Sequence, residues 1–169
     1  MKLLRLLSLL FLALQIFSAQ PKNILFVGNS YLYYNNSVHN YVEPMLREFY
    51  GSEIETKLSA IGGSKLYHHN IDHLLNPENL NLNQQIDMLI MQGGSTEVIS
   101  TSNQKKFIQT VKKYSTKAQK LGVKTALYMT HAFTEADSRF EPNLIRKIAQ
   151  TYFAAVSYTH LTLPTIYSV

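Results

Sequence analysis

Four short apolar runs, each followed by a stretch with helical spacing, constrain the fold of this chain more than any other feature. The first run ends at Gly28, and the others lie at residues 53–61, 86–94 and 123–130. A continuous apolar run that ends in glycine is typical of a strand buried on both faces. Strands that alternate with helices favour a parallel sheet covered on both sides, so we expect an α/β fold, a three-layer α/β/α sandwich.

The stretches between and after these runs carry apolar residues at the spacing of amphipathic helices. They lie at residues 38–49, 103–122 and 142–153. Pro44 lies inside the first stretch and predicts a kink or a late start there, because proline removes a helical hydrogen bond. About 150 residues are enough for one domain with one sizeable core.

Residues 1–19 are predicted to be a secretory signal peptide. They combine a basic start at Lys2 and Arg5 with an apolar run and a small residue, Ala19. We therefore expect a secreted or periplasmic protein whose domain spans residues 20–155, and an uncleaved N-terminal anchor is the alternative. The sequence contains no cysteine, so the domain is expected to fold without disulfides.

The charge of the chain is mildly basic. Without Lys2 and Arg5, 14 Lys and Arg face 11 Asp and Glu, which lowers the formal net charge from +5 to +3. The lysines gather in residues 103–122, where a solvated helix face explains them better than nucleic-acid binding does. We expect no nucleic-acid partner, no membrane association after signal cleavage, and a monomer.

Small and polar residues follow the predicted strands. They are Ser30, Gly62-Gly63, Gln92 and Thr130-His131. The carboxyl ends of parallel strands share one edge of a sheet, and ligands bind at that edge. A hydroxyl, backbone N–H groups and a side-chain amide gathered there are the groups that acyl transfer uses, because they supply a nucleophile and stabilise an oxyanion.

Three segments resemble, in order, the first three blocks of the SGNH or GDSL-like hydrolases. They are "ILFVGNSYLYYNN", "IGGSKLYHH" and "IDMLIMQGGS", and the similarity covers residues 22–155. The first matches the branch with Gly-Asn-Ser in place of Gly-Asp-Ser. The resemblance implies a flavodoxin-like SGNH hydrolase fold and an exported bacterial serine esterase or deacylase. Its substrates would be small or carbohydrate-linked esters.

The resemblance also implies roles for single residues. Ser30 would be the nucleophile that carries the acyl group, the backbone of Ser30 and Gly63 would donate to the oxyanion, and Gln92 would be the third donor. Tyr31 and His131 would face the substrate. The alternatives are that Ser30 only caps a helix and that Gln92 holds a loop through its amide.

The segment "HHNIDH" allows a different hypothesis, a metal hydrolase. His69 and His73 are four residues apart, but no glutamate completes a His-Glu-x-x-His pattern. We interpret His68, His69 and His73 as partly exposed surface imidazoles, and we expect no metal and no cofactor.

The catalytic base is missing from the pattern. The family takes it from an Asp-x-x-His block, yet Asp72, Asp87 and Asp137 have no histidine three residues later. Residues 156–169 contain no Lys, Arg, Asp or Glu and break the helical spacing. We expect a non-native tail on a C-terminally truncated chain that lacks the last strand and the base, and hence a poor enzyme. The alternative is a short protein whose last segment completes the sheet, acting as a non-catalytic carbohydrate-binding domain of this fold.

Overall fold

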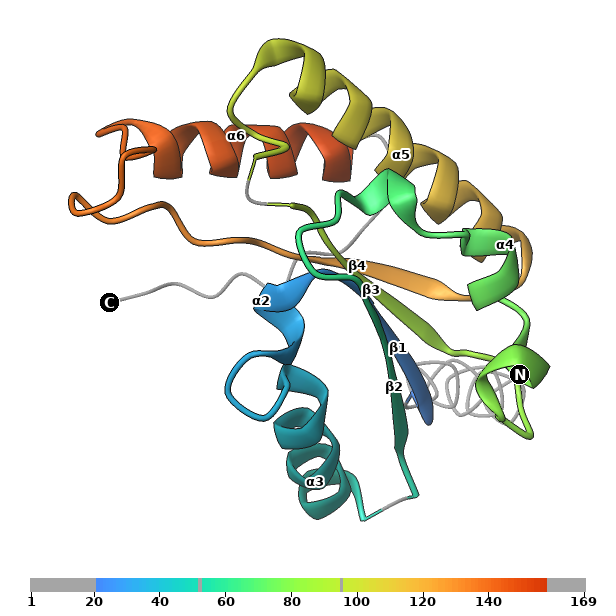
Figure 1. Ribbon diagram of the computed structural model, residues 1–169. Coiled ribbons are helices and arrows are strands. Elements are labelled where there is room, and N and C mark those ends of the chain that lie inside the picture. Colours follow the sequence, from blue (N-terminus) through green and yellow to red (C-terminus); the bar gives the residue numbers. More distant parts are fainter. Residues whose placement is uncertain (1–20, 52, 95, 158–169) are drawn as a thin grey trace, which may run out of the picture.

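The computed structural model describes residues 21–51, 53–94 and 96–157. Within these residues a parallel sheet forms with the strand order β2-β1-β3-β4 (Figure 1). Its strands are β1 (Asn23–Gly28), β2 (Glu55–Ala60), β3 (Met88–Gln92) and β4 (Lys124–Tyr128). Each strand lies inside a predicted apolar run, and the order is that of a flavodoxin-like sheet. The predicted fold class is confirmed.

Helices cover both faces of the sheet. The α-helices are α2 (Ser30–Tyr33), α3 (Val38–Tyr50), α4 (Ile71–Leu74), α5 (Thr101–Lys120) and α6 (Leu144–Ser157), and the 3₁₀ helices are η1 (Leu66–His68) and η2 (Pro77–Leu80). In Figure 1, α4, α5 and α6 lie on one side of the sheet and α3 on the other. Because α3 begins at Val38 and runs through Pro44, the helix has no late start, and the other predicted possibility, a kink at Pro44, stays a prediction.

Alternate residues of β1 serve the two cores. Leu25 and Val27 belong to the larger core, which is shared with α4, α5 and α6. Ile24 and Phe26 belong to the smaller core beneath α3, together with Leu32 of α2. This period of two is that of an extended strand, and all residues of β1 are buried. Because side chains of β1 pack into the cores on both faces of the sheet, the turn after Gly28 begins from a firmly packed strand.

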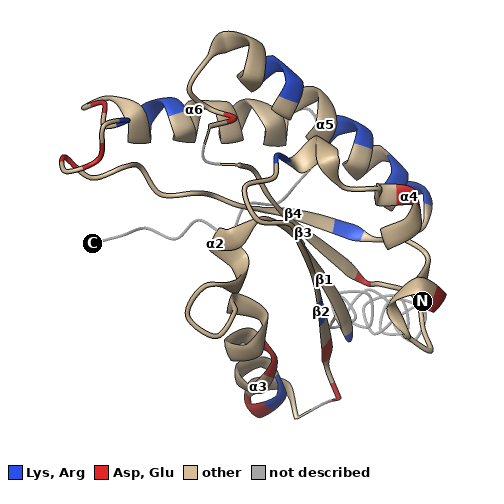
Figure 2. Cartoon of the chain, in the orientation of Figure 1, with Lys and Arg blue, Asp and Glu red and all other residues tan. Residues whose placement is uncertain are grey.

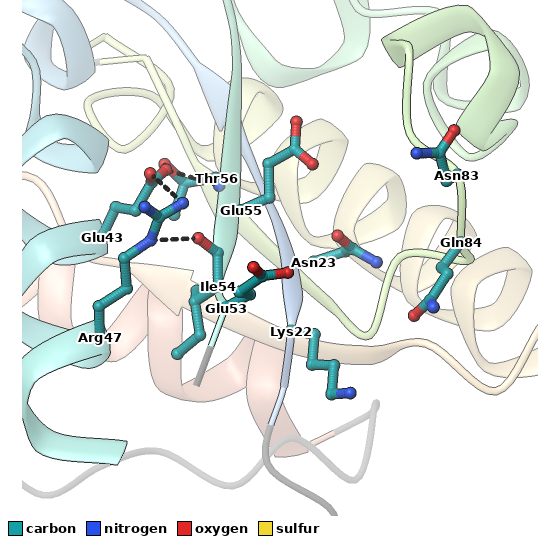
Figure 3. Close-up of a pocket in the computed structure, with 10 residues that line it drawn as sticks. All are labelled: Lys22, Asn23, Glu43, Arg47, Glu53, Ile54, Glu55, Thr56, Asn83 and Gln84. Atoms are coloured by element: carbon teal, nitrogen blue, oxygen red, sulfur yellow. Dashed lines mark hydrogen bonds and ion pairs between the residues drawn. The ribbon is translucent and has the colours of Figure 1, made fainter. Parts of the chain in front are cut away.

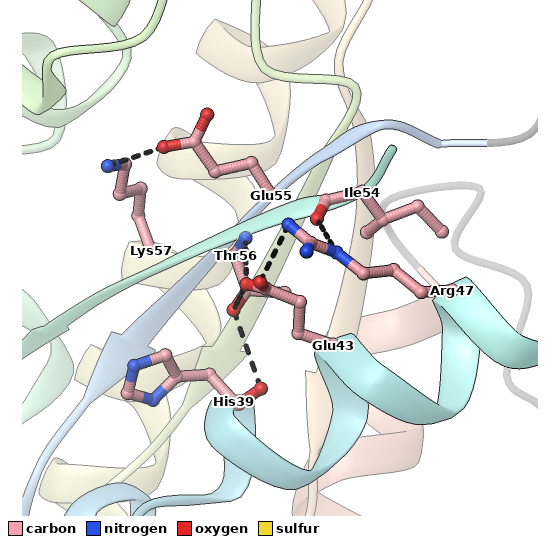
Figure 4. Close-up of polar contacts among 7 residues, drawn as sticks. All are labelled: His39, Glu43, Arg47, Ile54, Glu55, Thr56 and Lys57. Atoms are coloured by element: carbon pink, nitrogen blue, oxygen red, sulfur yellow. Dashed lines mark hydrogen bonds and ion pairs between the residues drawn. The ribbon is translucent and has the colours of Figure 1, made fainter. Parts of the chain in front are cut away.

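Two side chains of α3 cover the free edge of β2 (Figure 4). Glu43 Oε2 accepts hydrogen bonds from the Thr56 N–H at 2.9 Å and the Thr56 hydroxyl at 2.8 Å. Arg47 Nε donates to the Ile54 carbonyl at 2.8 Å and pairs with Glu43 at 2.9 Å. Burial alone would raise the pKa of Glu43, but the Thr56 hydrogen bonds and the charges of Arg47 and His39 lower it overall. These side chains satisfy backbone groups that would otherwise be open to another strand.

Lysines line the outer side of α5, and no acidic residue lies on that helix (Figure 2). Most of these lysines are exposed, as expected of a solvated helix face. Within the described part of the chain, no helix has the length and apolarity needed to cross a bilayer. The predicted signal peptide and nearly all of the predicted tail lie outside the described residues. Because α6 continues to Ser157, the domain boundary at residue 155 stays a prediction.

Candidate active site

Gly28 is the last residue of β1, and a side chain at this position would force its neighbours to move. A Cβ at this position would lie 2.5 Å from Gln92 Oε1 and 2.9 Å from Leu32 Cδ1, which is closer than real Cβ contacts. The missing side chain leaves room for the Gln92 amide to pass under the end of β1. The glycine of the Gly-Asn-Ser sequence therefore serves close packing between the first and third motifs.

Asn29 connects the loops at the carboxyl edge of the sheet. Its side chain is only 4% exposed, and its N–H donates to Gln92 Oε1 at 2.9 Å. Its Nδ2 donates to the Ser64 carbonyl at 3.1 Å, and its Oδ1 accepts from the Tyr31 N–H at 3.1 Å. Asn29 thus joins the first turn of α2 to the loops that follow β2 and β3.

Ser30 and Gly63 flank the hydrogen bond between Asn29 and Ser64, because Ser30 follows Asn29 in the chain and Gly63 precedes Ser64. Ser30 is the first residue of α2 and half-buried, while Gly63 is exposed in a turn with a φ of 66°. Among the described residues, the Ser30 hydroxyl, the Ser30 N–H and the Gly63 N–H have no hydrogen-bond partner. Because Asn29 bonds to Ser64, the residues next to them are held close together. The structure therefore brings one hydroxyl and two unpaired N–H groups to the same edge of the sheet.

Gln92 lies beneath this edge with both ends of its amide engaged. The side chain is 1% exposed. Its Oε1 accepts from the Asn29 N–H, and its Nε2 donates to the Gly93 carbonyl. This arrangement matches the alternative in which Gln92 holds a loop through its amide. The role of third oxyanion donor stays a prediction, because the bond to Gly93 uses only one of the two N–H donors of Nε2.

A cleft of about 430 Å³ has Tyr31, the residue after Ser30, in its lining, but Ser30 itself does not line it. It is lined by Tyr31, Tyr34, Asn35, Val38, Tyr41, Tyr128, Met129, Thr130 and His131. The rings of Tyr31 and His131 meet edge to face, with centroids 4.7 Å apart. His131 is exposed, and its Nδ1 lies 2.9 Å from the Ala132 carbonyl. The two residues predicted to face the substrate are therefore in contact at the cleft.

One prediction for the histidine cluster is wrong. His68 and His73 are exposed, but His69 is 5% exposed and lies between the hydroxyls of Ser64, 3.3 Å from Nε2, and Ser59, 3.5 Å from Nδ1. Burial lowers the pKa of His69, with a smaller opposing effect of the Gly28 carbonyl and a further lowering by His68. In the residues that the structure describes, no three His, Cys, Asp or Glu side chains form a group that could hold a metal.

Glu97 is a buried group that the sequence analysis missed. Its side chain is 1% exposed, and its Oε2 accepts hydrogen bonds from the Leu66 N–H at 3.0 Å and from the Gly94 N–H. Its Oε1 has no partner in the described part of the chain. Burial raises the pKa of Glu97, opposed by the two N–H groups and by the charges of Lys65 and Lys106. A single acid in a loop of the sequence gives no signal of such burial.

A second cleft, of about 690 Å³, lies at the opposite end of the strands (Figure 3). It is lined by Lys22, Asn23, Glu43, Arg47, Glu53, Ile54, Glu55, Thr56, Asn83 and Gln84. These residues surround the amino ends of β1 and β2, whereas Ser30 follows the carboxyl end of β1. The larger cleft is therefore separate from the candidate site.

No protein-family model and no curated protein matches the sequence. Solved structures do match. The SGNH-hydrolase family esterase AlinE4 is 14% identical with a TM-score of 0.64, and the match covers 86% of this chain and 76% of AlinE4. The acetyl xylan esterase AlAXEase is 17% identical with a TM-score of 0.59, covering 83% and 75%. The chain has the SGNH hydrolase fold.

A third solved structure also matches. The psychrotrophic esterase EstA from Pseudoalteromonas sp., in a structure inhibited by monoethylphosphonate, is 16% identical. Its TM-score is 0.61, and the match covers 84% of this chain and 75% of EstA. The fold predicted from the three motifs is confirmed.

Proposed function

We propose that this chain is an exported serine esterase or deacylase that forms an acyl-enzyme on Ser30. One observation carries the proposal: Ser30 and Gly63, with their unpaired N–H groups, flank the Asn29–Ser64 hydrogen bond at the edge of the sheet where ligands bind. The esterases among the solved structures of the same fold support this class of reaction.

The chemistry follows from these groups. The Ser30 oxygen attacks the ester carbonyl carbon, and the Ser30 and Gly63 N–H groups stabilise the oxyanion that forms. The carbon–oxygen bond to the alcohol then breaks, and water later releases the acid from Ser30. The proton of the Ser30 hydroxyl needs a base, and no histidine of the described chain is hydrogen-bonded to Ser30. An enzyme of this type without a base loses several orders of magnitude in rate, so turnover is expected to be slow if no histidine outside the described residues reaches Ser30.

The cleft lined by Tyr31 and His131 supports small or carbohydrate-linked esters as substrates. Tyrosine rings offer apolar faces for a sugar ring or an acyl chain, together with hydroxyls that form hydrogen bonds. Tyr31 and His131 are proposed to contact the substrate. AlAXEase is an acetyl xylan esterase, which is consistent with an acylated carbohydrate. Export is proposed from residues 1–19, which lie outside the described residues.

A non-catalytic carbohydrate-binding domain is the second candidate. It is favoured by the same tyrosine-lined cleft and by the lack of a histidine partner for Ser30 in the described residues. Hydrolysis of p-nitrophenyl acetate and of acetylated xylo-oligosaccharides separates the two functions. Hydrolysis that is lost in Ser30→Ala supports the esterase. Saturable sugar binding that is weakened in Tyr31→Ala, without hydrolysis by the wild-type protein, supports the binding domain.

A further inference from the structure

The Glu97 carboxylate joins the two loops that surround the candidate site. It lies between β3 and α5 and is 1% exposed. A single oxygen, Oε2, accepts the N–H of Leu66 from the loop after β2 and the N–H of Gly94 from the loop after β3. A buried carboxylate is costly unless hydrogen bonds compensate it, so these two contacts hold the loops to one point.

The effect of this junction extends to Asn29. Gly94 packs directly on the Ser64 carbonyl, because a Cβ at Gly94 would lie 2.8 Å from the Ser64 oxygen. That carbonyl accepts the hydrogen bond from Asn29 Nδ2 at 3.1 Å. Since Glu97 fixes Leu66 and Gly94, it also fixes the position of the carbonyl that holds Asn29.

We propose that Glu97 is a positioning residue that keeps the Ser30 and Gly63 N–H groups at the spacing that one oxyanion requires. Ser30 follows Asn29, and Gly63 precedes Ser64, so the two donors are set by the contact between Asn29 and Ser64. Glu97 itself does not touch the substrate. The inference rests on the proposed esterase function, because it assigns Glu97 to the geometry of that site.

The arrangement of the two oxygens defines the test variants. Both hydrogen bonds go to Oε2, while Oε1 has no partner in the described chain. The amide oxygen in Glu97→Gln can accept the same two bonds, whereas Glu97→Ala removes the acceptor. Glu43→Ala is a matched control, because Glu43 also accepts a backbone N–H (Figure 4) and lines the cleft at the amino ends of β1 and β2.

The experiment measures the labelling of Ser30 by an organophosphonate at a series of concentrations. In Glu97→Ala, the limiting labelling rate is expected to fall about 10²–10³-fold, as it does when an oxyanion donor is lost, while the half-saturating concentration stays unchanged. Glu97→Gln and Glu43→Ala should label like the wild-type protein. Amide hydrogen exchange, read by NMR, should show lost protection at Leu66 and Gly94 in Glu97→Ala only.

Three outcomes overturn the proposal. Glu97→Ala labels as fast as the wild-type protein, Glu97→Gln loses as much rate as Glu97→Ala, or the two amides keep their protection without the carboxylate. If Glu97→Ala does not fold, Glu97→Asp replaces it, because its shorter side chain cannot reach both N–H groups and should give the same loss. If the wild-type protein labels no faster than Ser30→Ala, the esterase function fails, and the amide exchange still tests the junction.

Discussion

Replacing Gln92 with methionine tests the hydrogen bonds that hold the Ser30 turn. Methionine is unbranched and similar in length to glutamine, so it can fill the space beneath Gly28. It has no amide, and it therefore leaves the Asn29 N–H and the Gly93 carbonyl without their partners. Both groups lie in buried residues, where water cannot replace the lost bonds.

The expected cost follows from these two groups. An orphaned buried donor or acceptor costs about 1–3 kcal/mol, and the more apolar methionine offsets part of the sum, so the free energy of unfolding should fall by about 2–4 kcal/mol. For a domain of this size that corresponds to a melting temperature about 6–12 °C lower.

Urea unfolding followed by circular dichroism measures this change, with Gln104→Met as the control. Gln104 is half-buried and donates one hydrogen bond to the Val98 carbonyl at 2.8 Å, so its loss should cost about 1 kcal/mol or less. A Gln92→Met protein within about 0.5 kcal/mol of wild type would refute the reasoning. If that stable variant also loses Ser30 labelling, Gln92 is the oxyanion donor that the motif resemblance implied.

Three further predictions concern stability. Glu43→Ala should lower the free energy of unfolding by about 1–3 kcal/mol in urea, because it orphans the edge N–H of Thr56, and an unchanged value contradicts the account of the β2 edge. Gly93→Ala would place a Cβ 2.7 Å from Phe107 Cε2 and should cost about 1–3 kcal/mol in the same assay, so a melting temperature equal to wild type would contradict that packing. Since burial lowers the pKa of His69, its neutral form stabilises the fold fully above about pH 6.5, and this stability is lost as the pH falls toward the lowered pKa. The stability difference between wild type and His69→Gln should therefore change below that pH, and a constant difference would contradict it.

The strands and long helices could be predicted because their signals are local. The run from Asn23 to Gly28 contains the apolar residues that both cores need, and α5 shows its buried face as a helical period. The order of the motifs also placed Ser30 and Gly63 at one edge of the sheet. Local spacing and the rules of parallel sheets are sufficient for this level of detail.

The hydrogen-bond partners within the site could not be predicted. Gln92 contacts Asn29, the residue before Ser30, and the direction of its amide is set by hydrogen bonds to the Asn29 N–H and the Gly93 carbonyl. Glu97 is compensated by N–H groups from two loops that are distant in sequence. His69 follows the short helix η1, and that turn places its ring between two serines instead of in solvent. The contacts of Gln92 with Asn29 and of Glu97 with Leu66 join segments that are distant in sequence, and the contacts of His69 depend on the path of one local turn; spacing in a sequence encodes neither.

The most direct test of the account is mass spectrometry of the protein after long incubation with a fluorophosphonate. The account predicts one adduct, located on the peptide that contains Ser30 and absent in Ser30→Ala. An adduct on another residue, or no adduct on the wild-type protein under conditions that label an esterase of the same fold, would contradict the assignment of Ser30 as the nucleophile.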